Sequence, residues 1–285
     1  MMRIPITMCH GINPSGDYPL TAEHLERLVK IAAELNFESI DYNHLDQWFR
    51  EEGELPPRPI MFDFDHPVKS MRYEMHDVLA KFGYSGNLFI NTEPLDELYS
   101  KPIPPKDIRD IMTWDEVGQL MESGWHIGAH TVTHPNLSQL SLEDTSGEKL
   151  RAELEQCDET LKKRLGITPQ DFAFTGTSWS SSAEREVSKR YRFGRLWIVG
   201  TEYQVDGKTM RYADLVGVDG DDEEDGGPPM AARYITKDSP PYRLPSMEIQ
   251  RQLIYHPDAF RYYLEGALIE IPPTSAQSSL SKGGP

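Results

Sequence analysis

The sequence has few cysteines and no long apolar segment. Only two cysteines, Cys9 and Cys157, occur among 285 residues, so one disulfide at most can form and a disulfide-rich fold is excluded. No run of about 18 apolar residues is present, so no transmembrane helix is expected. The beginning of the chain also lacks the apolar core of a signal peptide. We therefore expect a cytoplasmic protein, or a secreted one if the N-terminus was trimmed.

Positive charge is scarce. Lys and Arg number 29 against 46 Asp and Glu, which gives a net charge of -17. A chain of this charge repels phosphate backbones and anionic lipids, so nucleic acids and membrane surfaces are poor partners. The sequence is 38% hydrophobic and 26% charged, a composition typical of folded globular proteins. It contains no evident internal repeat.

Short apolar segments alternate with segments of helical periodicity. Strands are expected at 3–9, 37–41, 58–65, 87–91, 125–130, 171–176 and 195–200. Helices are expected after an N-cap at Thr21, at 43–53, 71–83, 113–124, 142–165 and 183–191, with Thr113 and Glu116 in capping-box spacing. This alternation predicts a parallel α/β sheet, open or closed into a barrel. We expect one domain over 1–270 with an exposed, mobile acidic loop at 217–229, and a disordered tail at 271–285.

The segment 61–66, MFDFDH, places two carboxylates and an imidazole in an otherwise apolar run. Asp63 and Asp65 are two residues apart, so in a strand their side chains point to the same face. Burying two unpaired carboxylates there would cost several kcal/mol or keep one of them protonated. A bound cation would remove this cost, so we expect a cation near the end of this strand.

A second polar cluster occupies 128–140, GAHTVTHPNLSQL. His130 and His134 are four residues apart, a spacing that in a helical turn brings both rings to one ion, although it also occurs in solvated loops. In an α/β barrel the C-terminal ends of the strands meet, so Asp65 and His130 can converge. We predict that Asp65, His130 and His134 hold Zn²⁺ or a similar divalent ion with open positions for water and substrate. Asp63 is then the base, with a structural role as an N-cap or in an ion pair as the alternative.

These motifs resemble those of the polysaccharide deacetylase family, carbohydrate esterase family 4. The closest match is to its His-x-x-x-His-Pro-x-Leu motif, found here at His130, Thr131, His134, Pro135 and Leu137. The resemblance covers residues from about 3 to 250. It implies a distorted (β/α) barrel with parallel strands and outer helices, an Asp-His-His metal triad and a second aspartate as base.

The first motif of the family can be aligned in two registers. When the segment is aligned with the Asp-x-Asp version of the motif in allantoinase-like members, the resemblance implies Asp63 as base and Asp65 as metal ligand. A gap-free alignment with the usual Phe-Asp-Asp-Gly motif instead makes Asp65 the base and His66 the ligand. We prefer the first register, because side chains at i and i+2 share a strand face whereas adjacent side chains do not.

The segment ITMCHG near the N-terminus resembles the opening of a subgroup whose final motif is permuted to the front of the chain. The resemblance implies that His10 is a general acid that protonates the departing amine. The position fits, because His10 follows an apolar strand and can face the same site; a loop histidine without function is the alternative. Cys9 should face the other side of the strand, so a Cys-His nucleophilic pair is not expected.

The third motif, FAFTGTSWS at 172–180, differs from the family pattern. Thr175 and Gly176 stand where many relatives have proline and tyrosine, and the arginine that holds the base in many relatives is absent. A backbone N–H at Gly176 remains a candidate oxyanion donor. Trp179 is either a platform for a sugar ring or a core aromatic. The segment 242–247, YRLPSM, resembles the closing strand of the domain.

Three functions are compatible with these motifs. The leading hypothesis is a metal-dependent hydrolase of carbon–nitrogen bonds that removes acetyl groups from an N-acetylated saccharide. The second keeps the site but assigns a small cyclic amide or ureide as substrate, which the Asp-x-Asp motif favours. The third is a non-catalytic relative that binds glycans, which the altered third motif favours. The expected partner is a small saccharide or glycan, and the sequence is compatible with an oligomer.

Overall fold

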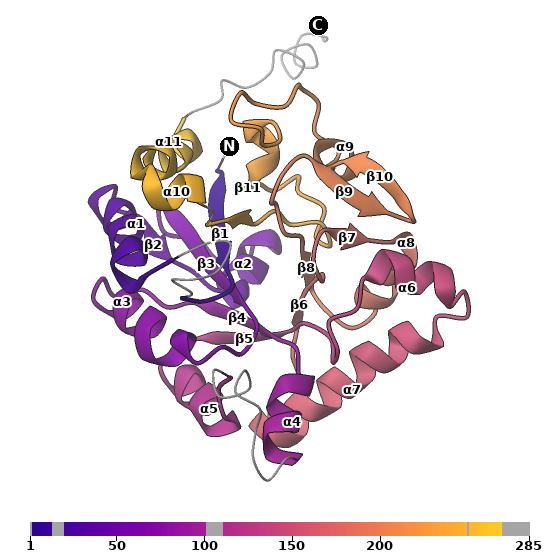
Figure 1. Cartoon of the computed structure of the whole chain (residues 1–285). Coiled ribbons are helices and arrows are strands. Elements are labelled where there is room, and N and C mark those ends of the chain that lie inside the picture. Colours follow the sequence, from indigo (N-terminus) through magenta and orange to yellow (C-terminus); the bar gives the residue numbers. More distant parts are fainter. Residues whose placement is uncertain (1, 13–19, 101–110, 250, 270–285) are drawn as a thin grey trace, which may run out of the picture.

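Parallel strands form the centre of the molecule and helices surround them (Figure 1). The computed structural model describes residues 2–12, 20–100, 111–249 and 251–269. The main sheet has the order β11 (Tyr234–Ile235), β1 (Ile4–Cys9), β3 (Pro59–Asp65), β4 (Asn87–Ile90), β5 (His126–Ala129), β6 (Asp171–Ala173) and β8 (Phe193–Arg195), and β2 (Glu38–Ser39) pairs with β3. All these pairs are parallel except β11 with β1. The predicted α/β fold is confirmed.

The segment around β12 (Met247–Glu248) joins the two ends of the parallel sheet. On one side, β12 pairs with β1 in parallel. On the other, Leu244 and Ser246 accept hydrogen bonds from the backbone N–H groups of Leu196 and Ile198, just beyond β8. The strands therefore curl into a distorted barrel, as predicted, and the expectation that 242–247 contributes the closing strand is confirmed.

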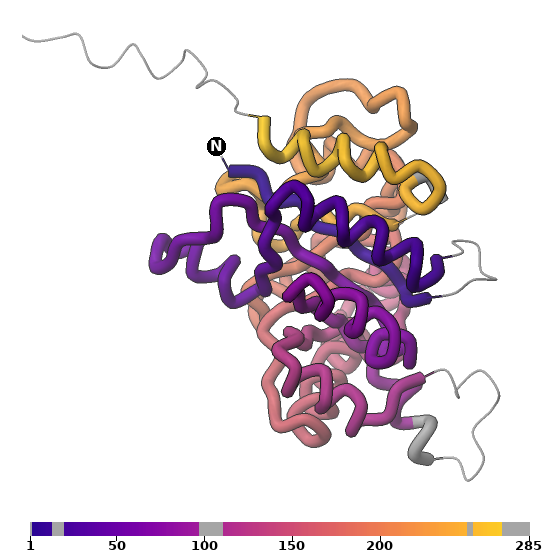
Figure 2. The backbone as a smooth tube through the Cα atoms, turned by 90° about the vertical axis from the view of Figure 1, so that its left-hand side faces the viewer, coloured from indigo at the N-terminus to yellow at the C-terminus, as the bar shows by residue number. Residues whose placement is uncertain are grey.

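Helices cover the outside of this barrel. The α-helices on the main sheet are α1 (Ala22–Glu34), α2 (Tyr42–Phe49), α3 (His76–Ala80), α4 (Glu93–Ser100), α5 (Trp114–Glu122), α6 (Leu137–Glu143), α7 (Glu148–Leu165) and α8 (Ser181–Val187). Two C-terminal helices, α10 (Arg251–Tyr255) and α11 (Pro257–Ala267), pack against α1 and complete the outer layer beside β1 (Figure 2). A small sheet of β7 (Ser178–Trp179), β9 (Glu202–Val205) and β10 (Lys208–Arg211) lies beside α9 (Tyr212–Val216) at the edge.

Local sequence signals fix several helix ends. Thr113 and Glu116 form the predicted capping box of α5, and Thr21 caps α1 with His24 in the reciprocal position. Other boundaries differ from prediction. The helix expected at 142–165 begins only at Glu148, because Gly147 adopts φ 69° and the Asp144 carboxylate accepts the backbone N–H of Lys149; residues 142 and 143 end α6. The helix expected at 71–83 opens with a π-helical segment, Met71–Met75, followed by α3.

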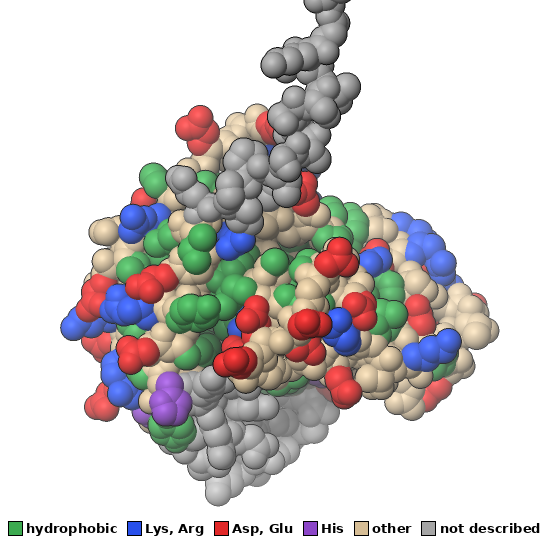
Figure 3. All heavy atoms as spheres, turned by 90° about the horizontal axis from the view of Figure 1, so that it is seen from above, with side chains coloured by type: hydrophobic (Ala, Val, Ile, Leu, Met, Phe, Trp, Pro, Cys, Tyr) green, Lys and Arg blue, Asp and Glu red, His purple; other side chains and the backbone are tan. Residues whose placement is uncertain are grey.

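The acidic loop at 217–229 is tied to its surroundings. Asp225 forms two hydrogen bonds of 2.7 Å with the buried Arg233, and Asp222 accepts one of 2.9 Å from Arg211. Most of the loop is exposed, as predicted. Figure 3 shows one face of the molecule, on which acidic side chains are interspersed with basic and apolar ones. The predicted tail at 271–285 lies outside the described residues.

Two expectations from composition can be compared with the described residues. Cys9 and Cys157 are both buried and free, so the disulfide that the sequence allowed is not formed between them. Burial raises the pKa of the Cys9 thiol to about 12, in line with the expectation that Cys9 is not a nucleophile. Within the described ranges, no helix is long and apolar enough to cross a membrane.

Candidate active site

Titratable side chains gather at the C-terminal ends of the barrel strands. Asp65 is the last residue of β3, and His10 and His130 directly follow β1 and β5. His130 Nε2 lies 3.9 Å from Asp65 Oδ2, so the two residues converge as the barrel geometry predicted. Both side chains are buried at the bottom of this group, whereas His10 is one-third exposed at its edge.

Three histidines form the tightest group of candidate ligands in the described part of the chain. One ring nitrogen from each of His66, His130 and His134 lies within 4.8 Å of the other two. The ring centroid of His134 is 4.8 Å from that of His66 and 4.8 Å from that of His130. The group contains His66, the ligand of the less preferred register, and does not contain Asp65.

Left-handed backbone conformations bring these rings together. Six non-glycine residues in the described ranges have positive φ, and three of them are here: His66 at 68°, Thr131 at 67° and His134 at 61°. Such conformations are uncommon outside glycine and are concentrated at functional sites. His130 and His134 meet through this loop and not through the helical turn that their spacing suggested.

Hydrogen bonds orient two of the three imidazoles. His130 Nδ1 is 2.8 Å from the carbonyl oxygen of Ala173, and His66 Nδ1 is 2.8 Å from Asn91 Oδ1. His130 Nε2 is buried and has no hydrogen-bond partner among the described residues. Burial lowers the pKa of His66 to about 4 and the pKa values of His130 and His134 below their usual range. Neutral imidazoles with a free nitrogen are the form that binds metal ions.

Asp65 is held by a buried arginine. Arg195, the last residue of β8, is fully buried, and its Nη2 donates to Asp65 Oδ1. Burial alone would raise the pKa of Asp65, but the charge of Arg195 holds it at about 2. The carboxylate is therefore ionised, with its second oxygen facing His130. The expectation that no arginine holds a carboxylate of this site was wrong: Arg195 does so from outside the third motif. A single charge in the apolar segment 193–200 is the same kind of signal as the charges in 61–66.

Asp63 lies deeper in the barrel and has no access to solvent. Its Oδ2 accepts a hydrogen bond of 2.7 Å from the Tyr42 hydroxyl and lies 3.2 Å from Arg195 Nε. Its Oδ1 accepts one of 2.9 Å from Asn87. Burial raises the pKa of Asp63 to about 6, against the opposing charge of Arg195. The partners that offset the burial of this carboxylate are thus protein groups.

His10 reaches the histidine group from the N-terminal strand. Its ring stacks on His66 at 5.3 Å and meets the edge of Trp197 at 5.0 Å. Its Nδ1 is 3.4 Å from Oε1 of Glu248, which is buried on β12. The fold therefore places the N-terminal His10 beside residues that are distant from it in the chain. Glu248 carried no signal in the sequence, because its partner lies on a strand more than 200 residues away.

Two other predicted residues have different surroundings. Gly176 has φ 58°, and a Cβ atom there would meet nothing within 4 Å, so its backbone borders open space. Trp179 is only 5% exposed; its Nε1 donates to Glu184, and the Arg243 guanidinium lies over its ring at 4.7 Å. We correct the expectation that Trp179 is a platform for sugar, because neither face of a buried and covered ring is open to a substrate.

The match to a family model decides the family. Residues 52–193, about half of the chain, match the model of the polysaccharide deacetylases. The chain belongs to the polysaccharide deacetylase family. It is accordingly a hydrolase of carbon–nitrogen bonds other than peptide bonds. The matched segment contains Asp65 and the three histidines, whereas His10, Arg195 and Glu248 lie outside it. No curated protein matches the sequence.

Several solved structures have the same fold. The structure of the deacetylase PplD from Streptococcus pyogenes in complex with acetate superposes with a TM-score of 0.66 at 12% identity, over 94% of this chain and 99% of that one. BC0361, a polysaccharide deacetylase from Bacillus cereus, superposes with a TM-score of 0.61 at 15% identity, over 91% of this chain and 69% of that one. IcaB from Ammonifex degensii superposes with a TM-score of 0.61 at 12% identity, over 92% of this chain and 97% of that one. At these identities the similarity establishes the fold.

Proposed function

We propose that this deacetylase removes acetyl groups from an N-acetylated saccharide with the help of a divalent metal ion. The observation that carries the proposal is the group of three imidazoles within 4.8 Å beside a carboxylate fixed by Arg195. Metal ligands, a base and an acid can all be assigned at this mouth of the barrel.

The residues present fit a zinc-type ion. His130 Nε2 is buried without a hydrogen bond, and such a polar atom is costly unless something binds it. Three imidazole nitrogens suit zinc and neighbouring transition metals and leave coordination positions for water and substrate. His66, His130 and His134 would hold the ion. An ion bound there would act as a Lewis acid, polarising the acetyl carbonyl and making water a better nucleophile at neutral pH.

Asp65 is our proposed base. It is ionised, next to His130, and oriented by Arg195, so it can take a proton from the attacking water. Asp63, the base in our preferred sequence register, is surrounded by Tyr42, Asn87 and Arg195 and has no exposed surface. The geometry therefore supports the other register, in which His66 replaces Asp65 as ligand.

His10 is the proposed general acid. Glu248 lies against its Nδ1, which leaves Nε2 to give a proton to the departing amine. Open space lies where a Cβ atom at Gly176 would be, and the backbone N–H of Gly176 is the proposed donor to the carbonyl oxygen as negative charge develops there.

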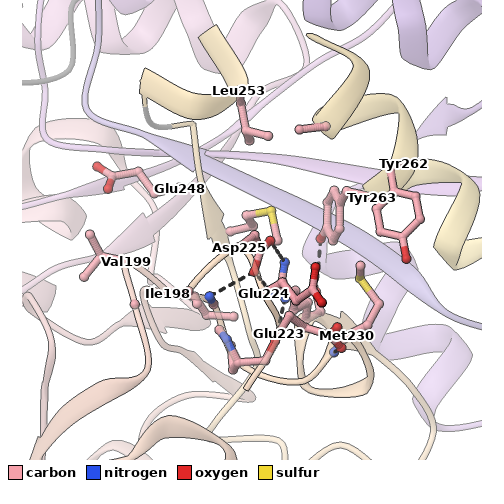
Figure 4. Close-up of a pocket in the computed structure, with 17 residues that line it drawn as sticks. Ile198, Val199, Glu223, Glu224, Asp225, Met230, Glu248, Leu253, Tyr262 and Tyr263 are labelled. Atoms are coloured by element: carbon pink, nitrogen blue, oxygen red, sulfur yellow. Dashed lines mark hydrogen bonds and ion pairs between the residues drawn. The ribbon is translucent and has the colours of Figure 1, made fainter. Parts of the chain in front are cut away.

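A cavity next to Glu248 offers room for the rest of a saccharide. Its volume is about 420 Å³, within the range of small-molecule sites. Figure 4 shows Glu248 and Val199 on one side, Tyr262 on the other and the acidic residues Glu223 and Glu224 between them. Carboxylates accept hydrogen bonds from sugar hydroxyls, and the exposed Tyr262 offers an aromatic face. We propose that sugar units beside the reacting one lie here.

The other two functions lose support. The Asp-x-Asp motif favoured the ureide hypothesis, but Asp63 is enclosed by protein groups. The altered third motif favoured the glycan-binding hypothesis, but the histidine group and the His10–Glu248 pair support a catalytic site. Acetate release from N-acetylglucosamine oligomers, and ring opening of cyclic ureides, should be compared with and without a chelator. We expect chelator-sensitive acetate release from the oligomers; activity on ureides alone, or full activity in chelator, would refute the proposal.

A further inference from the structure

We infer that Asp63 is a positioning residue that holds Arg195 in place and, through it, the Asp65 carboxylate. The inference rests on the proposed role of Asp65 as base. It gives a function to the one titratable group of the 61–66 motif that neither binds the proposed metal nor meets the substrate.

The Arg195 guanidinium is shared between two carboxylates of one strand. Its Nη2 donates a hydrogen bond to Asp65. Its Nε lies 3.2 Å from Asp63 Oδ2, and this contact is an ion pair without a hydrogen bond. Its Nη1 donates to Ser246 Oγ at 3.1 Å, and its plane lies over the Phe89 ring at 4.9 Å. Because Asp63 and Asp65 are two residues apart, they face the same interior, and the guanidinium can span them.

Asp63 is itself fixed from other directions. Tyr42 on α2 donates to its Oδ2, and Asn87 on β4 donates to its Oδ1. A long arginine side chain has many rotamers, and Asp63 supplies a charged contact at the Nε end that excludes most of them. Tyr42 and Asn87 therefore tie the orientation of Arg195 to α2 and β4.

Stability alone gives a poor reason for this arrangement. Two carboxylates and one guanidinium, all buried, carry an excess negative charge and a desolvation cost that a well-packed apolar group would avoid. An arrangement that fixes a base to within about half an ångström repays such a cost in catalysis. Asp63 contacts no proposed ligand, so its effect on the reaction must pass through Arg195.

The test is Asp63→Asn, which removes the charge and keeps the shape. The variant can be accommodated, because Asn87 Oδ1 is buried without a partner and can accept from the new amide once the Asn87 amide is turned. We expect kcat for acetate release to fall about 10- to 100-fold, with KM within about twofold and metal content unchanged. The matched control is Asp171→Asn, which breaks the pair of the buried Asp171 with the partly buried Arg192 at 2.6 Å, at the opposite end of the strands. It should lower Tm and leave kcat unchanged.

A spectroscopic readout separates this inference from the proposed function. The Arg195 Nε–H resonance in ¹⁵N spectra, assigned through its loss in Arg195→Lys, should shift and exchange faster with water in Asp63→Asn than in the wild type. The shift of this resonance is expected even if the wild type releases no acetate. A wild type without acetate release would refute the proposed function and leave the contact between Asp63 and Arg195 to be tested by the resonance. An unchanged resonance, or a kcat within twofold of the wild type together with the lower Tm of the control, would overturn the inference. If Asp65→Asn lost both its turnover and its metal, Asp65 would be a metal ligand, and Asp63 would return to the role of base.

Discussion

The imidazole rings of His10 and His66 stack with their centroids 5.3 Å apart and their planes inclined by 25°. One residue follows the first strand of the barrel and the other follows β3, and β1 and β3 are neighbours in the sheet. This contact links the N-terminal histidine to the proposed metal ligands. It is the structural basis for assigning His10 to the reaction.

Replacing His10 by alanine should impair amide hydrolysis selectively. Because an amine must be protonated to leave, we expect kcat for acetate release to fall on the order of 10²- to 10⁴-fold. An activated aryl acetate, whose leaving group needs no proton, should be hydrolysed at nearly the wild-type rate. Metal content measured by elemental analysis should not change. Equal losses on both substrates would exclude a role as general acid.

The metal ligands can be distinguished from the base by metal content. His66→Ala and His130→Ala should each lose most of the bound metal after dialysis, because each removes one of three imidazoles. Asp65→Asn should retain the metal and lose turnover. His256→Ala, an exposed histidine at the start of α11, is the control and should retain both. Metal loss in Asp65→Asn with full occupancy in His66→Ala would favour the opposite register.

Tyr262 and Trp179 should differ in their effects on substrate binding. Tyr262 is 66% exposed at the cavity, so Tyr262→Ala should raise KM several-fold for longer N-acetylglucosamine oligomers and leave the shortest substrates unaffected. Trp179→Phe should lower Tm, since it loses the hydrogen bond to Glu184, and should leave KM unchanged. A KM effect confined to Trp179 would indicate that the saccharide lies elsewhere.

Asp158 provides a pH-dependent test of the packing between α7 and the segment after α8. Burial raises its pKa to about 6, although the Tyr191 hydroxyl donates to it at 2.7 Å. Below pH 4 the carboxyl is protonated in folded and unfolded chains, so there is no penalty. From about pH 4 to 6 the unfolded chain ionises first, stability falls as pH rises, and the full penalty is present above pH 6.

Asp158→Asn should therefore stabilise the protein at pH 8 and not at pH 4. Linkage sets an upper limit of about 3 kcal/mol on the gain. Urea unfolding at the two pH values measures it. Glu155→Gln, which changes an exposed carboxylate on the same helix, should show a much smaller difference between the two pH values. A gain of equal size at pH 4 and 8 would mean that ionisation of Asp158 is not its source.

Local patterns in the sequence determined the α/β architecture and several contributors to the site. Apolar strands alternate with capped amphipathic helices, so the barrel and its closing segment could be predicted from periodicity and family resemblance. The parallel topology then requires strand C-termini to meet, which is why Asp65 and His130 could be placed together in advance.

The tertiary structure alone decided how the 61–66 motif is used. The rule that adjacent strand residues face opposite sides holds for an extended backbone, but His66 has a φ of 68°. No local sequence pattern predicts a left-handed histidine at the end of a strand. The partner of Asp63 and Asp65 also could not be read locally, because Arg195 is 130 residues from Asp65 in the chain and reaches it only when β8 closes against the other strands. Sequence fixes which charges enter the barrel, whereas pairing between distant strands decides which of them neutralise one another and which remain to act on a substrate.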